Sequence, residues 1–173
     1  MAAEAIRLFN PDDQPWDQLI ERYANDVPVL KHLGLIAVVG GRPEDAAVAW
    51  RQALSVEPTN ESILVDLTNF YLRMRDPARA SLAAERLLQV NGRLAEYHWM
   101  LSAARQGRGE LNGAAQAAED ALRRDPTAVP IRAWLVGAYE QLQRPDDARR
   151  HADVLGRLGV SVPRRAPAAE ENR

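Results

Sequence analysis

Apolar residues recur along most of the chain at the spacing i, i+3, i+4, i+7, which is typical of helices with one buried face. In the first clear stretch this stripe comprises Leu30, Leu33, Gly34 and Ala37. A short segment follows in which proline suits the first turn of a new helix and carboxylates suit its N-terminal end, as in Gly-Arg-Pro-Glu-Asp at 41–45. The pattern predicts pairs of helices joined by tight turns.

The helix pairs repeat four times with a period of 34 residues, from Val27 to Val162. The seventh place is always leucine and the twentieth always alanine, at Leu33, Leu67, Leu101, Leu135 and Ala46, Ala80, Ala114, Ala148. A fixed period of this length indicates a stacked array of similar supersecondary units. We expect the alanine to lie where the two helices of a pair approach most closely, because a larger side chain would force them apart.

The period divides the chain into units at 27–60, 61–94, 95–128 and 129–162. Before them, in the N-terminal segment 1–26, Trp16, Leu19, Ile20 and Tyr23 share one helical face. This predicts an amphipathic helix over 13–25, either a cap on the array or a docking arm for another subunit. Residues 163–173 show no apolar periodicity and are interpreted as a flexible tail.

The repeat resembles the tetratricopeptide repeat family. The first unit carries the family's pattern most fully, with Leu33-Gly34, Ala46, Trp50, Ala53-Leu54 and Pro58. The resemblance implies an all-α fold, a right-handed superhelical α-solenoid of four helix hairpins with an extra N-terminal helix. It also implies a protein that binds other proteins rather than an enzyme.

Composition narrows the function further. The net charge of −2 and the pI near 5.9 argue against nucleic-acid binding, which needs a basic surface. With no cysteine, a disulfide framework or a thiolate metal site is excluded. The sequence contains neither a signal peptide nor a membrane-spanning run, so we expect no direct membrane insertion. The compartment stays open between cytoplasm and periplasm.

Three features could suggest chemistry. The glycine-rich segment 107–113 resembles a phosphate loop but falls at a predicted turn between helices, so we interpret it as that turn. His32, His98 and His151 occupy unrelated places of the repeat, which argues against a metal site. No serine or aspartate is arranged with a histidine in a catalytic pattern. We therefore expect a non-enzymatic protein without cofactor or metal.

In the family that the chain resembles, one face of each first helix lines a concave groove. We call this face the first-helix surface, and in this chain it comprises Lys31, Leu35, Val38 and Val39, then Val65, Asn69 and Leu72, then Trp99, Met100 and Ala103, and finally Trp134 and Gly137. The set is largely apolar, so something should cover it. The candidates are a partner's apolar or helical segment, the chain's own N-terminal residues Ile6, Leu8 and Phe9, or solvent.

These features predict an adaptor that holds an apolar or helical segment of another protein within a larger assembly. Trp99, Met100 and Trp134 would be its anchors. A clamp for a chaperone's carboxylate tail is disfavoured, because only Lys31 matches the cationic places of such clamps. Two alternatives remain: a self-assembling homo-oligomeric scaffold, and an accessory subunit of a membrane-associated enzyme complex or envelope assembly pathway, as similar bacterial repeat proteins often are.

Overall fold

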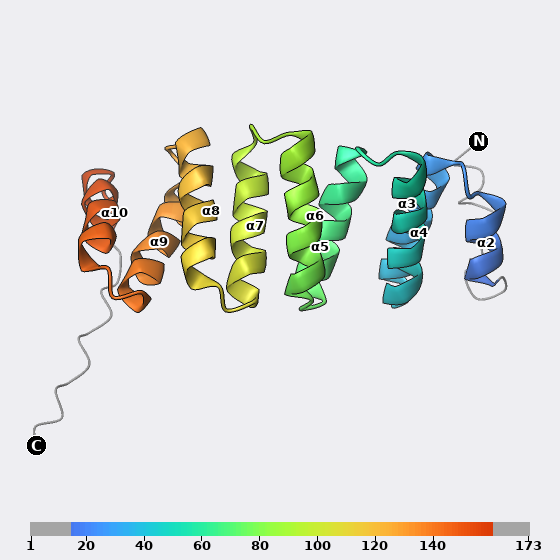
Figure 1. The fold of residues 1–173 in the computed structure, drawn as a ribbon, viewed down its shortest axis with the longest axis horizontal. Coiled ribbons are helices and arrows are strands. Elements are labelled where there is room, and N and C mark those ends of the chain that lie inside the picture. The colour runs from blue at the N-terminus through green and yellow to red at the C-terminus, as the bar shows by residue number, and fades with distance from the viewer. Residues whose placement is uncertain (1–14, 161–173) are drawn as a thin grey trace, which may run out of the picture. The chain divides into compact units, whose positions relative to one another are not determined.

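The computed structural model describes residues 15–160, and within that range the chain forms nine α-helices and no strand (Figure 1). They are α2 (Trp16–Arg22), α3 (Val27–Val39), α4 (Pro43–Val56), α5 (Glu61–Arg73), α6 (Pro77–Val90), α7 (Ala95–Gly107), α8 (Leu111–Arg124), α9 (Val129–Gln141) and α10 (Pro145–Arg157). The first helices of the hairpins begin at 27, 61, 95 and 129 and the second helices at 43, 77, 111 and 145, so every helix keeps the 34-residue register. The expected all-α fold of four hairpins with an additional N-terminal helix is confirmed.

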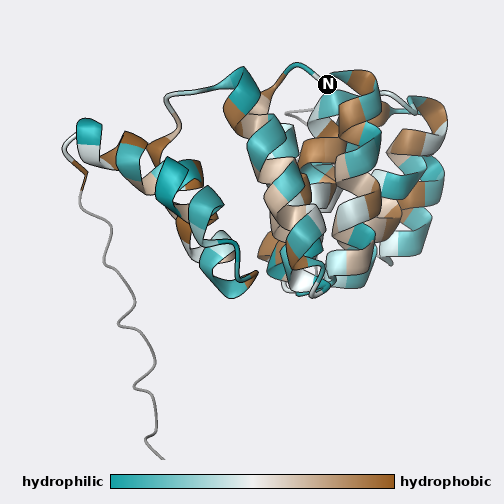
Figure 2. Cartoon of the chain, turned by 60° about the vertical axis from the view of Figure 1, so that its left-hand side comes forward, coloured by the Kyte–Doolittle hydropathy of each residue, from teal (hydrophilic) through white to brown (hydrophobic). Residues whose placement is uncertain are grey.

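The chain divides after Gly92 into two compact units. In the first unit α3 pairs with α4 and α5 with α6, while α4 also packs against α2 and α5. In the second unit α7 pairs with α8 and α9 with α10, and α8 joins the two hairpins through α9. Each helix carries both hydrophobic and hydrophilic residues, as the two-sided pattern of the sequence requires (Figure 2).

The N-terminal helix α2 is shorter than the expected span of 13–25. It ends at Arg22 because the chain must turn before Asp26, whose side chain caps the next helix by accepting a hydrogen bond from the Val29 amide at 3.1 Å. The apolar face is as expected, since Trp16, Leu19 and Ile20 are buried. Residues 13 and 14, the N-terminal Ile6, Leu8 and Phe9, and the tail at 163–173 lie outside the described residues.

Small residues lie where the two helices of a hairpin pack together. A Cβ added to Gly34 would overlap the indole of Trp50, whose Nε1 donates a hydrogen bond to the Lys31 carbonyl at 3.1 Å. In the second unit the Ser102 hydroxyl donates to the Ala114 carbonyl at 2.8 Å, directly across the hairpin. The repeated alanines are all buried, at Ala46, Ala80, Ala114 and Ala148.

The turn inside each hairpin has the same backbone conformation. Its residue at the fifteenth place is left-handed in every unit, with φ of 71° at Gly41, 55° at Arg75, 77° at Gly109 and 57° at Gln143. The next amide then donates back to the first helix, as Arg42 does to Ala37 at 2.8 Å and Arg144 to Tyr139 at 2.9 Å. The segment 107–113 contains this turn, so its interpretation as a turn between helices is confirmed.

Candidate interaction surface

In the first unit the first-helix surface is apolar and partly open. Leu35 and Val39 on α3 are 40% and 90% exposed, and Val38 beside them is half-buried. On α5 the side chains of Val65 and Leu72 are half-buried and Asn69 is exposed. Apart from Lys31, α3 has no Lys, Arg, Asp or Glu, so a hydrophobic helix reaches the surface here.

The charged member of this surface, Lys31, is already paired. Lys31 Nζ lies 3.6 Å from Asp66 Oδ2 and also donates to the Ser62 hydroxyl, which ties α3 to α5. Both charged side chains are partly buried. Because Asp66 of the same chain balances the charge of the Lys31 ammonium, this part of the surface does not present a free cation to a partner's carboxylate.

In the second unit the surface is aromatic. Trp99 on α7 and Trp134 on α9 meet edge to face, with ring centroids 5.4 Å apart. Both indoles are half-buried and pack against the core around Leu135. Ala103 and Gly137 are half-buried too, whereas Met100 is only 6% exposed. On this unit's part of the first-helix surface, Trp99 and Trp134 are therefore the large apolar side chains that keep some surface open, and Met100 belongs mainly to the interior.

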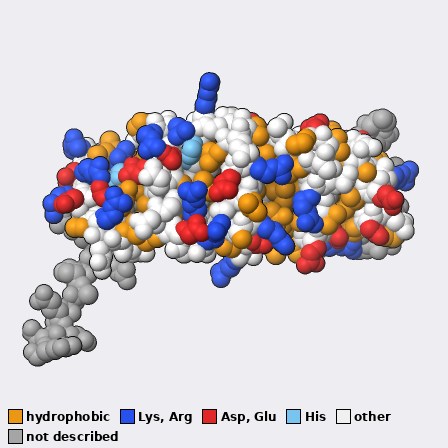
Figure 3. All heavy atoms as spheres, viewed as in Figure 1, with side chains coloured by type: hydrophobic (Ala, Val, Ile, Leu, Met, Phe, Trp, Pro, Cys, Tyr) orange, Lys and Arg blue, Asp and Glu red, His pale blue; other side chains and the backbone are white. Residues whose placement is uncertain are grey.

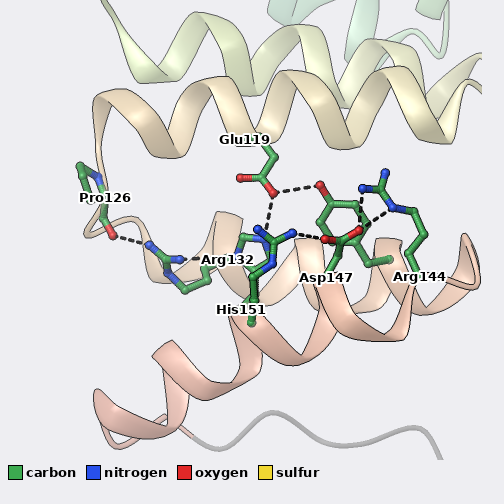
Figure 4. Close-up of polar contacts among 8 residues, drawn as sticks. Glu119, Pro126, Arg132, Arg144, Asp147 and His151 are labelled. Carbon is green, nitrogen blue, oxygen red and sulfur yellow. Dashed lines mark hydrogen bonds and ion pairs between the residues drawn. The ribbon is translucent and has the colours of Figure 1, made fainter.

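A polar cluster that the sequence pattern did not reveal joins α8, α9 and α10 (Figure 4). Glu119 Oε1 accepts hydrogen bonds from the Tyr139 hydroxyl at 2.9 Å and pairs with His151 Nε2 at 2.9 Å. The His151 ring stacks on Tyr139, with centroids 5.7 Å apart. Because arginine can only donate, the contact of 3.4 Å from Arg132 Nη1 makes His151 Nδ1 an acceptor, and Nε2 then carries the proton toward Glu119.

These contacts shift two pKa values. The hydrogen bond from His151 holds the pKa of the Glu119 carboxyl below its usual value, although burial acts in the opposite direction. Burial raises the pKa of Tyr139 to about 12, and the hydrogen bond to Glu119 adds to this effect. Glu119, Tyr139 and His151 hydrogen-bond to one another, so the arrangement ties α8, α9 and α10 together.

The three histidines do not meet. His32 is exposed and its Nδ1 lies 2.7 Å from the Pro28 carbonyl of its own helix, whereas His98 and His151 are buried. Within residues 15–160 no three histidine or carboxylate side chains form a group that could hold a metal ion. Across the same residues, no helix combines the length and apolar character needed to cross a membrane.

The comparisons with known proteins agree with the repeat. Residues 106–159 match the family model of the tetratricopeptide repeat. A comparison with curated protein sequences finds no significant match. A solved structure of MamA from Desulfovibrio magneticus RS-1, from residue 41 to its end, has a TM-score of 0.71 at 16% identity and covers 91% of this chain and 90% of that one.

Two further solved structures show the same fold. A structure of MamA AMB-1 has a TM-score of 0.72 at 23% identity, covering 85% of this chain and 81% of that one. A crystal structure of MamA has a TM-score of 0.70 at 20% identity, covering 80% and 81%. The family model over residues 106–159 and the shared all-helical fold confirm the resemblance to the tetratricopeptide repeat that the 34-residue period predicts.

Proposed function

We propose that the chain is a non-enzymatic adaptor that holds an apolar or helical segment of another protein on its first-helix surface, within a larger assembly. The observation that carries the proposal is the exposure of Leu35 and Val39 on a helix that is apolar around most of its circumference. Fully burying an exposed leucine or valine side chain is worth about 1.5–3 kcal/mol. Because Val39 is 90% exposed and Leu35 only 40%, most of the gain from covering both comes from Val39.

The second unit supports the same reading through its aromatic pair. The indoles of Trp99 and Trp134 are held rigidly edge to face and keep part of their surface open. Aromatic side chains that are fixed before binding tend to dominate the energy of an interface, because little conformational entropy is lost when the partner arrives. They are the proposed anchors in this unit.

Charge favours an apolar occupant over an acidic one. The Asp66 carboxylate already forms an ion pair with Lys31, so a partner's carboxylate would have to displace Asp66 from the Lys31 ammonium. The last helix is a less suitable contact surface, because α10 exposes Arg149, Arg150, Asp153 and Arg157. Desolvating these charges would oppose stacking of a second copy on that end, so we do not propose a self-assembled scaffold built through α10.

The test compares two variants of the full chain by affinity purification from the native cells and quantitative mass spectrometry. Leu35→Glu with Val39→Glu places two charges on the first-helix surface at exposed sites, where the fold should tolerate them. Val56→Glu with Met74→Glu makes the same change at exposed apolar residues elsewhere in the unit, which are 40% and 50% exposed. We expect recovery of a specific partner to fall at least about tenfold in the first variant only.

Equal recovery from wild type and from the variant with Leu35→Glu and Val39→Glu would contradict the proposal. Trp134→Ala extends the test to the second unit. Because Trp134 also packs against the core there, circular dichroism must first show that this variant keeps its helices. A folded Trp134→Ala variant that still recovers the partner fully would remove the second unit from the proposed surface.

A further inference from the structure

A second surface, distinct from the first-helix surface, lies in the first unit between α4, α5 and α6. It is an open groove of about 390 Å³. Leu54, Leu64, Leu67 and Tyr71 form its apolar floor. At roughly 30 Å³ per water molecule, this volume accepts a few side chains of a partner rather than a whole helix.

Arginines form the rim of this groove. Arg51 comes from α4, and Arg79 and Arg86 come from α6. No carboxylate lies among the residues that line the groove. We call it the arginine-rimmed groove. In the space-filling view, Lys and Arg side chains lie among exposed hydrophobic ones in the region of α6 (Figure 3).

Two of the three guanidinium groups have no acidic partner. Arg51 Nε donates to the Ala47 carbonyl at 3.1 Å, and Arg86 Nη2 donates to the Pro58 carbonyl at 2.9 Å. Among residues 15–160, neither forms an ion pair with a carboxylate. A carbonyl takes one donor and leaves the charge and the remaining donors of each guanidinium available. The rim therefore carries positive charge that the chain itself does not neutralise.

The third arginine helps to shape the groove. Arg79 lies 3.3 Å from Asp76 and its guanidinium sits over the Tyr71 ring at 5.8 Å. Beside it on α6, Leu82 is 63% exposed. An exposed leucine that lines the same groove as an apolar floor and two arginines without an acidic partner among the described residues suits a ligand that brings both apolar surface and negative charge.

We propose that the arginine-rimmed groove binds a protein segment in which one or two large apolar side chains are flanked by aspartate or glutamate. The apolar side chains enter the groove over Leu54 and Leu67, and the carboxylates meet Arg51 and Arg86. A guanidinium can bind a carboxylate through two parallel hydrogen bonds, which fixes the direction of the segment. A polyanion such as nucleic acid fits less well, because the floor is apolar and the chain has a net charge of −2.

The experiment selects displayed random peptides of about 14 residues on the full wild-type chain, long enough to carry acidic residues on both sides of an apolar centre. Selected peptides are then measured by fluorescence anisotropy against two variants. Arg51→Glu with Arg86→Glu reverses the rim, whereas Arg22→Glu with Arg73→Glu makes the same change of charge at exposed arginines outside the groove. Thermal unfolding followed by circular dichroism confirms that both variants are folded.

We expect the selected peptides to share an apolar residue flanked by acidic ones. Their affinity should fall at least about tenfold in the rim variant, change less than about twofold in the control, and weaken as salt is added. Leu82→Asp should weaken the same peptides. Leu35→Glu with Val39→Glu should leave them bound, which separates this groove from the proposed function of the first-helix surface.

Four results would overturn the proposal. The first is that selection yields no peptide, or yields peptides without acidic residues. The second is that the rim variant and the control bind the selected peptides equally well. The third is that the rim variant alone lowers the mass seen in light scattering, because the occupant would then be a second copy of this chain. Binding of dioleoylphosphatidylglycerol vesicles that the rim variant loses, in place of peptide binding, would overturn it as well.

Discussion

Replacing Gln143 by glycine is expected to stabilise the chain, although the substitution removes a side chain and no contact is gained. Gln143 lies at the hairpin turn of the fourth unit with φ of 57°, and Arg75 holds the equivalent place in the second with φ of 55°. In the first and third units the same place is taken by Gly41 and Gly109, at 71° and 77°. The four turns therefore form an internal comparison between residue types in one backbone conformation.

The magnitude follows from two opposing terms. A side chain in the left-handed region costs about 1–2 kcal/mol, which glycine avoids. Glycine in turn gives the unfolded chain more freedom, which costs about 0.4–1 kcal/mol. Gln143→Gly should therefore raise the free energy of unfolding by about 0.5–1 kcal/mol, as the difference between these terms. Gly109→Ala reverses both terms, so it should lower the free energy of unfolding by a similar difference, about 0.5–1 kcal/mol.

The assay is equilibrium unfolding in urea followed by circular dichroism, with Arg75→Gly as a second copy of the test in the other unit. A shift of about 2–4 °C in the thermal midpoint per kcal/mol is expected for a chain of this size. The reasoning would be refuted if Gln143→Gly destabilised the chain while Gly109→Ala left it unchanged. Such a result would mean that the Gln143 side chain contributes more than the backbone conformation costs.

Three further predictions concern packing and pH. Gly34→Ala should lower the free energy of unfolding by about 1–3 kcal/mol in a urea titration, because the new methyl group overlaps Trp50; an unchanged value would show that the indole moves at no cost. The pKa of Glu119 is lower in the fold than its ordinary value of 4.5. The ionised carboxylate therefore stabilises the fold above pH 4.5, and this stabilisation is lost as pH falls through the lower, folded pKa. Glu119→Gln should flatten the fall in the free energy of unfolding at acid pH, and an equally steep fall in wild type and variant would contradict this. The pKa of Tyr139 is raised from 10.0 to about 12. The protonated hydroxyl therefore stabilises the fold fully below pH 10, and this stabilisation is lost as pH rises toward about 12. Tyr139→Phe should remove this loss of stability at alkaline pH, and a variant that loses the same stability would show that another group titrates.

The helices and their register follow directly from the sequence, because the stripe of apolar residues determines which face of each helix is buried. The leucine and alanine places are enough to predict where helix pairs begin, but the contact between Gly34 and Trp50 is seen only in the structure. What a period cannot show is which faces remain open. Met100 belongs to the apolar part of a first helix, yet it is buried, because neighbouring side chains rather than helical periodicity decide its exposure.

The Glu119 cluster illustrates a different limit. Glu119 and His151 lie on successive second helices, 32 residues apart and close to one repeat length. Pairs at about this spacing on stacked helices are neighbours in space, so a search for complementary polar residues one repeat apart could have found them. A search for histidine pairs alone could not have found this cluster. The partner of His151 is a carboxylate, and the third member, Tyr139, comes from the first helix between them. The period does not predict the arginine-rimmed groove either, because Arg51, Arg79 and Arg86 do not recur as arginine at the same places of the other units.

Lys31, held against Asp66 on the first-helix surface, is also the only lysine of the chain. A reagent that attacks primary amines can therefore react at one side chain and otherwise only at the N-terminal amine. An amine-reactive cross-linker would report specifically on whatever lies beside α3. Acylation of Lys31 would leave the Asp66 carboxylate without its cation beside the proposed docking surface.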